Sequence, residues 1–142
     1  MTAEEMAALH AAAFTAERPW TAAEFTQLLA TSGAFLRTQA EGFALGRAVA
    51  GEAELLTIAV HPRAQGRGIG GALMTAWLDR AAEEASAAFL EVAADNGAAI
   101  ALYHRHGFAT VARRAGYYRR VAARADALVM RAALAIARTA QP

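Results

Sequence analysis

The sequence predicts an α/β fold of the α+β kind, in which helices flank a mixed, mostly antiparallel sheet. Short apolar runs separated by two-residue turns occupy residues 34–60, as in an antiparallel meander. An apolar run, a glycine-rich turn, a helical run and a second apolar run then follow over residues 55–92. This order is typical of a parallel strand–helix–strand crossover. We expect residues 1–142 to form a single domain, because this length suffices for one sizeable core.

The composition favours a packed protein of the cell interior and excludes several kinds of chemistry. Hydrophobic residues make up 56% of the chain, and cysteine is absent, which excludes disulfides, thiolate nucleophiles and cysteine-ligated zinc. The net charge of +1 predicts no general attraction to nucleic acid. No apolar run approaches the ~18 residues of a membrane span, and no signal sequence opens the chain. We therefore expect a cytoplasmic protein without a nucleic-acid or membrane partner.

Two helices are expected before the sheet. A capping threonine and an acidic first turn precede apolar residues at helical spacing, which predicts a helix over residues 3–14. Pro19 helps to break this helix, and Thr21 caps the next one, with Glu24 three positions later as in a capping box. The Thr-Ser-Gly sequence at residues 31–33 ends the second helix.

The remaining elements follow from apolar periodicity and from turn residues. Gly46 suggests a bulge in the second strand, and Gly107 a C-terminal helix cap. Residues 114–125 are polar and are expected to form a loop that carries Gly-Tyr-Tyr. The expected strands are 34–39, 43–50, 53–60, 87–92, 108–113 and 126–133, and the expected helices between them are 69–85 and 97–104.

The stretch from Gln65 to Gly71 is the first candidate for a binding site. It holds four glycines and Arg67, directly after an apolar strand and directly before a helix. Free backbone N–H groups at a helix start bind anions, glycine lets a phosphate approach, and a guanidinium can pair with it. No Gly-Lys-Ser/Thr follows, so the stretch is not a P-loop, and its glycines are out of frame for a dinucleotide fingerprint. A purely structural strand–helix turn is the alternative.

Three polar residues are candidates for chemistry, each with a structural alternative. Glu91 lies within an apolar strand, either on the wet face of the sheet or at a cleft where a carboxylate can act as general base. Asn96 is either a helix cap or a ligand-binding residue, and Tyr103 is either a core aromatic or part of a functional signature. The single residues leave these alternatives open.

Two signatures together resemble those of the GCN5-related N-acetyltransferases, the GNAT superfamily. Q-x-x-G-x-G from Gln65, after Ile-Ala-Val-x-Pro, resembles its pyrophosphate-binding motif. N-x-x-A-x-x-L-Y-x-x-x-G-F from Asn96 to Phe108 resembles its second signature. Residues 53–118 further resemble the RimI type, the N-terminal alanine acetyltransferases of a small-subunit ribosomal protein. The resemblance implies a GNAT fold with a βαβ acetyl-CoA-binding core, acetyl-CoA as co-substrate, and no metal.

The resemblance also implies a role for individual residues. Glu91 is implied as general base and Tyr103 as general acid. The implied acetyl-CoA site has three parts. A strand offers backbone groups to the pantetheine arm at Ile58, Ala59 and Val60, and Asn96 binds the same arm. A turn cradles the pyrophosphate with Gln65, Gly66, Arg67, Gly68, Ile69, Gly70 and Gly71. Acceptor contacts are implied at Trp20, Thr57, Tyr117 and Tyr118.

The sequence departs from the family in three places. Thr57 stands where asparagine is usual, and His61 stands where aspartate is common. The chain begins at the first helix, so we expect the family's first strand to be short or missing and one sheet edge to be uncovered, or else the start to be trimmed or misassigned.

The acceptor implied by the resemblance is a protein N-terminal amine, the alanine of a small-subunit ribosomal protein. A small-molecule amine acceptor and a non-catalytic acyl-CoA-binding module are the alternatives. Intact Glu91 and Tyr103 favour an enzyme, and the aromatic pair Tyr117-Tyr118 favours a peptide acceptor.

Overall fold

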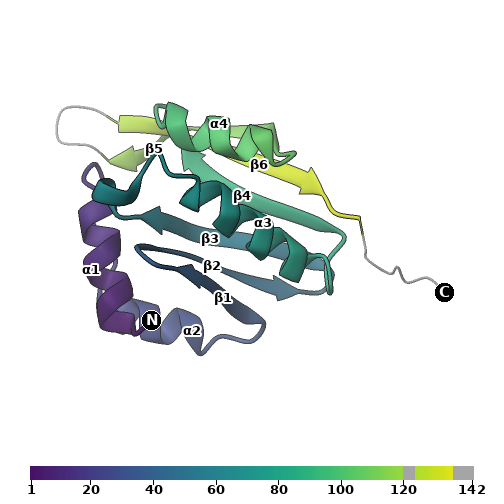
Figure 1. The fold of residues 1–142 in the computed structure, drawn as a ribbon. Coiled ribbons are helices and arrows are strands. Elements are labelled where there is room, and N and C mark those ends of the chain that lie inside the picture. Colours follow the sequence, from purple (N-terminus) through teal and green to yellow (C-terminus); the bar gives the residue numbers. More distant parts are fainter. Residues whose placement is uncertain (120–123, 136–142) are drawn as a thin grey trace.

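A computed structural model describes residues 1–119 and 124–135 of the chain. A six-stranded sheet of order β1-β2-β3-β4-β6-β5 lies at its centre (Figure 1), and every neighbouring pair is antiparallel except β3 and β4. The elements are α1 (Ala3–Ala13), α2 (Ala22–Leu29), β1 (Ala34–Gln39), β2 (Gly42–Val49), β3 (Glu52–Val60), a 3-10 turn η1 (Pro62–Ala64), α3 (Ile69–Ala81), β4 (Ala87–Ala93), α4 (Gly97–Arg105), β5 (Ala109–Arg119) and β6 (Arg124–Ala133).

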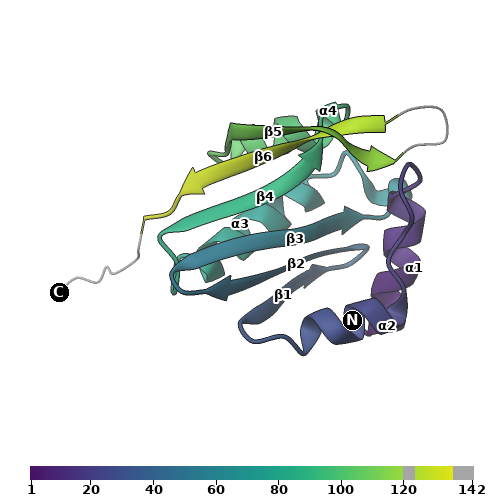
Figure 2. The ribbon, with the colours of Figure 1, turned by 180° about the vertical axis from the view of Figure 1, so that it is seen from behind.

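Helices cover both faces of the sheet, but they cover one face only in part. α3 and α4 lie on one face, while α1 and α2 pack on the other face over β1, β2 and β3 (Figures 1 and 2). Figure 2 shows that β4, β6 and β5 have no helix on that second face. We call this uncovered part the open face. Among the side chains of its strands, Arg131 is exposed, Glu91 is partly exposed and Ala127 is buried.

Each face of the sheet has its own hydrophobic core. On the α3 side, Leu73, Met74 and Trp77 are fully buried against the strands, and the Phe35 ring stacks on Trp77 at 5.2 Å. On the α1 side, the largest buried groups include Phe25, and the core also contains Met6 and Phe43. Burial of such side chains is worth about 1.5–3 kcal/mol each before conformational entropy is counted.

Most expected elements are confirmed. The β1–β2–β3 meander is antiparallel, β3–α3–β4 is a parallel crossover, and Thr21 forms the expected capping box with Glu24. Within the described residues no strand precedes α1, and β1 forms one edge of the sheet, as expected. No helix in residues 1–119 and 124–135 has the length and apolar character needed to cross a membrane.

Three expectations need correction. The helix expected over residues 69–85 ends at Ala81, because the chain then tightens into a turn in which the Glu84 N–H bonds the Ala81 carbonyl. The irregularity at Gly46 exists, but Leu56 of β3 is the extra residue in the register. The loop expected over residues 114–125 is wrong, because β5 continues through Tyr117 and Tyr118 to Arg119 and β6 begins at Arg124; residues 120–123 lie outside the described part.

Candidate active site

The two central parallel strands separate partway along their length. The β3–β4 ladder runs only from the Glu52–Ala87 pair to the Glu54–Phe89 pair, although both strands continue beyond it. Strand backbone that has lost its ladder partner can bind an extended ligand through main-chain hydrogen bonds. The predicted residues Ile58, Ala59 and Val60 all lie on the separated part of β3.

The glycine-rich turn follows this part of β3 and leads into α3. Gly66 and Gly68 have φ of 80° and 79°, and a Cβ at either position would meet no atom within 4 Å. The left-handed backbone, and not a lack of space, therefore accounts for glycine at both positions. The first bond of α3 runs from the Ala72 N–H to the Gly68 carbonyl, so the three intervening N–H groups have no partner within the helix.

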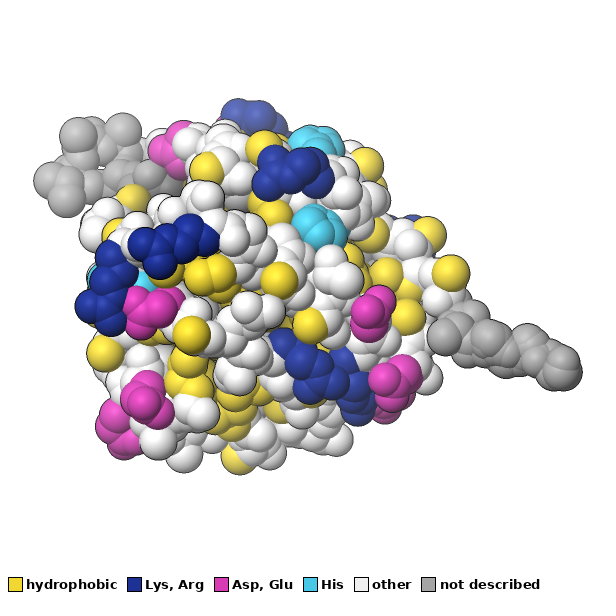
Figure 3. Space-filling view, viewed as in Figure 1, with side chains coloured by type: hydrophobic (Ala, Val, Ile, Leu, Met, Phe, Trp, Pro, Cys, Tyr) yellow, Lys and Arg dark blue, Asp and Glu magenta, His cyan; other side chains and the backbone are white. Residues whose placement is uncertain are grey.

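The start of α3 differs from the starts of the other three α-helices. Thr2, Thr21 and Asn96 each accept a backbone N–H bond and so cap their helices, at 3.1, 3.2 and 3.2 Å. Gly68 is the N-cap of α3 and supplies no side-chain oxygen. Figure 3 shows basic side chains over the segment between β3 and α3, and Arg67 of this segment is exposed. The turn thus combines uncapped N–H groups with positive charge, which suits an anion.

Three of the predicted or family-variant residues make structural contacts here. The Gln65 side chain donates to the Val60 carbonyl at 3.1 Å and so ties the turn to the end of β3. Asn96 uses its oxygen in the α4 cap, which is the structural alternative considered for it. His61 accepts the Arg63 N–H at 3.2 Å and caps η1. Thr57 is buried on β3, beside the extra residue of the register.

Glu91 of β4 points to the open face. Its neighbours Leu90 and Val92 belong to the core on the α3 side, and side chains alternate between the faces of a strand. The Glu91 side chain is 29% exposed, and its Oε1 lies 3.6 Å from Nη1 of Arg114. Its Oε2 is buried and has no hydrogen-bond partner among the described residues. A buried acceptor oxygen without a protein partner is costly, and catalytic groups are among the places where such oxygens occur.

Tyr103 of α4 is buried in the core on the α3 side. Its ring meets Phe108 edge-on at 6.0 Å between centroids. Burial raises the pKa of the Tyr103 hydroxyl well above its usual range, and Tyr118 adds to this effect. The hydroxyl therefore holds its proton at neutral pH and is a hydrogen-bond donor. Because Tyr118 affects this pKa electrostatically, the Tyr118 end of β5 lies near Tyr103 of α4.

A bulge in β5 carries the predicted acceptor-binding tyrosines. Between the Arg114–Ala127 and Tyr118–Ala125 pairs, three β5 residues face the single residue Asp126. The Asp126 carboxylate accepts the Gly116 N–H at 2.7 Å, and this bond is the largest cause that lowers the pKa of Asp126. Gly116 has φ of 61°, which the bulge requires. Tyr117 is 49% exposed as a result.

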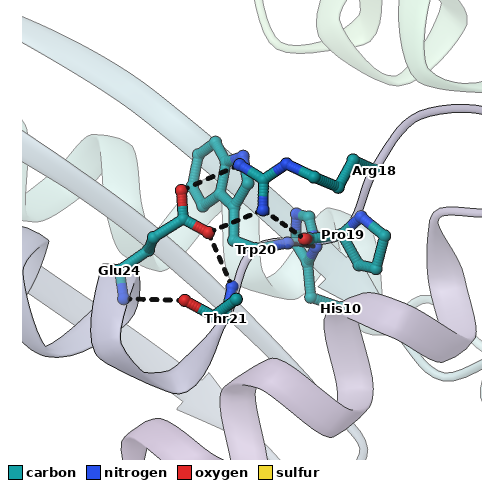
Figure 4. A network of polar contacts seen from close by, with 6 residues as sticks. All are labelled: His10, Arg18, Pro19, Trp20, Thr21 and Glu24. Atoms are coloured by element: carbon teal, nitrogen blue, oxygen red, sulfur yellow. Dashed lines mark hydrogen bonds and ion pairs between the residues drawn. The ribbon is translucent and has the colours of Figure 1, made fainter.

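The connection between α1 and α2 is ordered around His10 (Figure 4). His10 is 4% exposed, its Nδ1 accepts the Trp20 N–H at 3.2 Å, and its ring lies against Phe14 and Trp20 at 4.4 and 5.0 Å. Burial lowers the pKa of His10 to about 4. Arg18 and Glu24 form two parallel hydrogen bonds of 2.9 Å across the same connection. Trp20 is thereby fixed beside α1, whose C-terminal end lies next to the end of β5 in both views (Figures 1 and 2).

Sequence reasoning gave no role to Arg114, Asp126 or His10. The contacts of Arg114 and Asp126 depend on the pairing of β5 with β6. This pairing was not expected, because residues 114–125 were predicted to form a loop. The spacing of His10 with Met6 and Phe14 on one helical face was the available signal that its ring is buried. No group of three or more histidine, aspartate or glutamate side chains in the described ranges is arranged to hold a metal ion.

Comparison with known proteins identifies the family. The acetyltransferase (GNAT) family matches residues 3–108. The chain is 41% identical over 138 residues to N-alpha-acetyltransferase RimI of Mycobacterium tuberculosis, covering 91% of this chain and 85% of that protein. It is 42% identical over 89 residues to the [ribosomal protein bS18]-alanine N-acetyltransferase of Escherichia coli, covering 62% of this chain and 60% of that protein.

A solved structure agrees with these relatives. The crystal structure of the ribosomal-protein-S18-alanine N-acetyltransferase from Escherichia coli superposes with a TM-score of 0.82 at 30% identity, covering 91% of this chain and 85% of that one. The family resemblance noted in the sequence is thus confirmed, and so is the GNAT fold. The chain belongs to the acetyltransferase (GNAT) family and is an N-acetyltransferase resembling the RimI type.

Proposed function

We propose that this protein transfers an acetyl group from acetyl-CoA to a protein N-terminal amine, and that its acceptor is the N-terminal alanine of a small-subunit ribosomal protein in the cytoplasm. The observation that carries the proposal is the position of Glu91. Its carboxylate lies on the open face, on the strand that separates from β3, with one oxygen buried and unpaired. The activities of the Mycobacterium tuberculosis and Escherichia coli relatives support the same acceptor class.

The residues around the glycine turn fit acetyl-CoA. The uncapped α3 start and the left-handed glycines offer backbone N–H groups for the pyrophosphate, and Arg67 adds a guanidinium. The separated part of β3 offers main-chain groups to an extended pantetheine arm. Residues that hold the coenzyme in this proposal are Ile58, Ala59, Val60, Gln65, Gly66, Arg67, Gly68, Ile69, Gly70, Gly71 and Asn96.

Glu91 and Tyr103 divide the proton chemistry between them. Acetyl-CoA supplies an acetyl group activated as a thioester. Glu91 takes a proton from the acceptor's ammonium, so that the neutral nitrogen can bond to the acetyl carbon. Backbone N–H groups of β3 donate to the carbonyl oxygen as charge develops on it. The carbon–sulfur bond breaks, and the sulfur receives the proton that Tyr103 keeps at neutral pH. The nitrogen loses its second proton as the amide forms, and this proton restores the Tyr103 hydroxyl.

The acceptor is bound between two walls of the open face in this proposal. The exposed ring of Tyr117 forms one wall with Tyr118, the two rings being 5.2 Å apart and edge-on. Trp20, fixed by His10, belongs to the other wall. Aromatic rings on both sides suit the backbone of an extended peptide, because such rings give a large contact area at low cost in conformational entropy.

Acetylation of a short peptide tests the proposal. The purified protein is incubated with acetyl-CoA and an alanine-starting peptide that also contains lysine, and thiol release and the acetylated position are measured. The same peptide with a blocked N-terminus is the control. We expect turnover only with the free N-terminus. Turnover with polyamines or amino acids but not with the peptide would establish a small-molecule enzyme, and acetyl-CoA binding without turnover a non-catalytic module.

A further inference from the structure

Arg114 forms an ion pair with Glu91, yet the proton chemistry above does not use it. Arg114 pairs with Ala127 of β6, and Glu91 pairs with Val129 of the same strand. These β6 partners are two residues apart and so share one face of the sheet. Arg114 and Glu91 therefore meet diagonally across β6 on the open face, which neither α1 nor α2 covers.

Two contacts hold the Arg114 guanidinium in place. Nη1 lies 3.6 Å from Oε1 of Glu91, and the guanidinium carbon lies 5.4 Å from the centroid of the Tyr117 ring. The Arg114 side chain is 54% exposed and that of Glu91 is 29% exposed, so this ion pair contributes little to stability. Its effect is on orientation: a guanidinium that lies beside both the carboxylate and the Tyr117 ring favours one placement of that carboxylate.

The bulge in β5 sets the position of Arg114 relative to Tyr117. Asp126 holds the bulge by accepting the Gly116 N–H at 2.7 Å and a 2.6 Å bond from Arg113. Arg124 donates to the Gly116 carbonyl at 3.2 Å from the same strand as Asp126. These bonds fix the backbone of the bulge, and so they fix where Arg114 lies relative to Tyr117. Bulges next to active sites commonly redirect side chains in this way.

We propose that Arg114 is a positioning residue for acetyl transfer: its ion pair with Oε1 of Glu91 orients the carboxylate that takes the proton of the acceptor's amine. This inference rests on the proposed function, in which Glu91 is the base. The transferred proton goes from the acceptor nitrogen to the Glu91 carboxylate, while the guanidinium keeps its own protons and remains beside Oε1.

Arg114→Gln tests the proposal against a matched control. The control is Arg131, an exposed arginine on the open face of β6. It pairs with Phe89 of β4, two residues before Glu91 in the sequence. We expect Arg114→Gln to lower kcat on the alanine-starting peptide by about 10-fold or more, as misplacement of a reacting group does. KM for acetyl-CoA should stay unchanged, and Arg131→Gln should behave as wild type. Arg114→Lys restores the charge but not the planar fork, so its kcat should lie between the two.

A double-mutant cycle separates positioning from a merely structural role. If Arg114 acts through Glu91, then Arg114→Gln has no further effect in a Glu91→Gln background. An equal loss in both backgrounds would overturn the proposal, as would Arg114→Gln activity equal to that of Arg131→Gln. Should Arg114→Gln fail to fold, Arg114→Lys serves in the same cycle.

The role of Arg114 and the proposed acetyl transfer to a peptide N-terminus are overturned by different results. A wild-type protein that acetylates the peptide while Arg114→Gln matches the control overturns only the role of Arg114. A wild-type protein that acetylates no amine overturns the proposed function, and the role of Arg114 with it. If a polyamine is the acceptor, the same cycle is measured on the polyamine.

Discussion

Acidification should destabilise the protein through the buried side chain of His10. Burial among aromatic rings lowers the pKa of His10 from 6.5 to about 4, while in the unfolded chain the imidazole has its ordinary pKa. Between these two values the unfolded state binds the extra proton. The free energy of unfolding therefore falls as the pH drops from about 6.5 through about 4, and it is unaffected by His10 above that window.

The structure sets the size of this effect. The interval from 6.5 to about 4, at about 1.4 kcal/mol per pH unit, amounts to about 3 kcal/mol in total. About 2 kcal/mol of this should be lost between pH 7 and pH 5. Glu24 contributes in a lower window, because its hydrogen bonds with Arg18 and Thr21 lower the pKa of its carboxyl from 4.5 to about 2.

Urea unfolding at pH 7 and pH 5 measures the effect in three proteins. In His10→Gln the amide oxygen can still accept the Trp20 N–H, but it does not titrate in this range. The loss between pH 7 and pH 5 should thus be about 2 kcal/mol smaller in His10→Gln than in wild type. His104→Gln removes an exposed histidine and should match wild type. Equal pH dependence in wild type and His10→Gln would refute the reasoning.

Three further predictions concern other parts of the site and the fold. Gly68→Asp should abolish acetyl-CoA binding by calorimetry while the protein stays folded, because its carboxylate would occupy the anion site; Gly51→Asp, with the same left-handed φ of 81° in another turn, is the control and should bind normally. Gly46→Ala should lower the free energy of unfolding by about 1–3 kcal/mol, since a Cβ would come within 2.4 Å of the Trp77 ring; an unchanged urea midpoint would contradict this. Tyr103→Phe should fold and bind acetyl-CoA but turn over more slowly, and a wild-type rate would remove its role as acid.

The elements that could be predicted from the sequence have local signals. Thr21 and Glu24 form a capping box within four consecutive residues, and the glycine turn marks the start of α3 through its own composition. The extended β5 has no such local signal. Its bulge depends on Asp126, ten residues after Gly116 and on the neighbouring strand. Intrinsic propensity predicts a loop for the polar, glycine-containing residues 114–125. Their strand structure depends instead on pairing with β6, which is a tertiary effect.

The same difference explains which site residues were found. Glu91 stood out because a carboxylate in an apolar strand is anomalous, and the glycine turn because of its spacing. Arg114 is one arginine in a chain whose 14 basic residues are all arginine, so its pairing with Glu91 left no trace in the sequence. The role of His10 likewise depends on Trp20, which folds back along α1 from the following connection.

The rate of Glu91→Gln on an alanine-starting peptide, measured against pH, shows whether Glu91 is the general base. Glutamine keeps the shape of the side chain but cannot accept the proton. The rate at neutral pH should fall by ~10²-fold or more, as expected for loss of a general base. It should recover in part at higher pH, because a larger fraction of the acceptor amine is then already neutral. A Glu91→Gln rate near that of wild type at neutral pH would contradict the account.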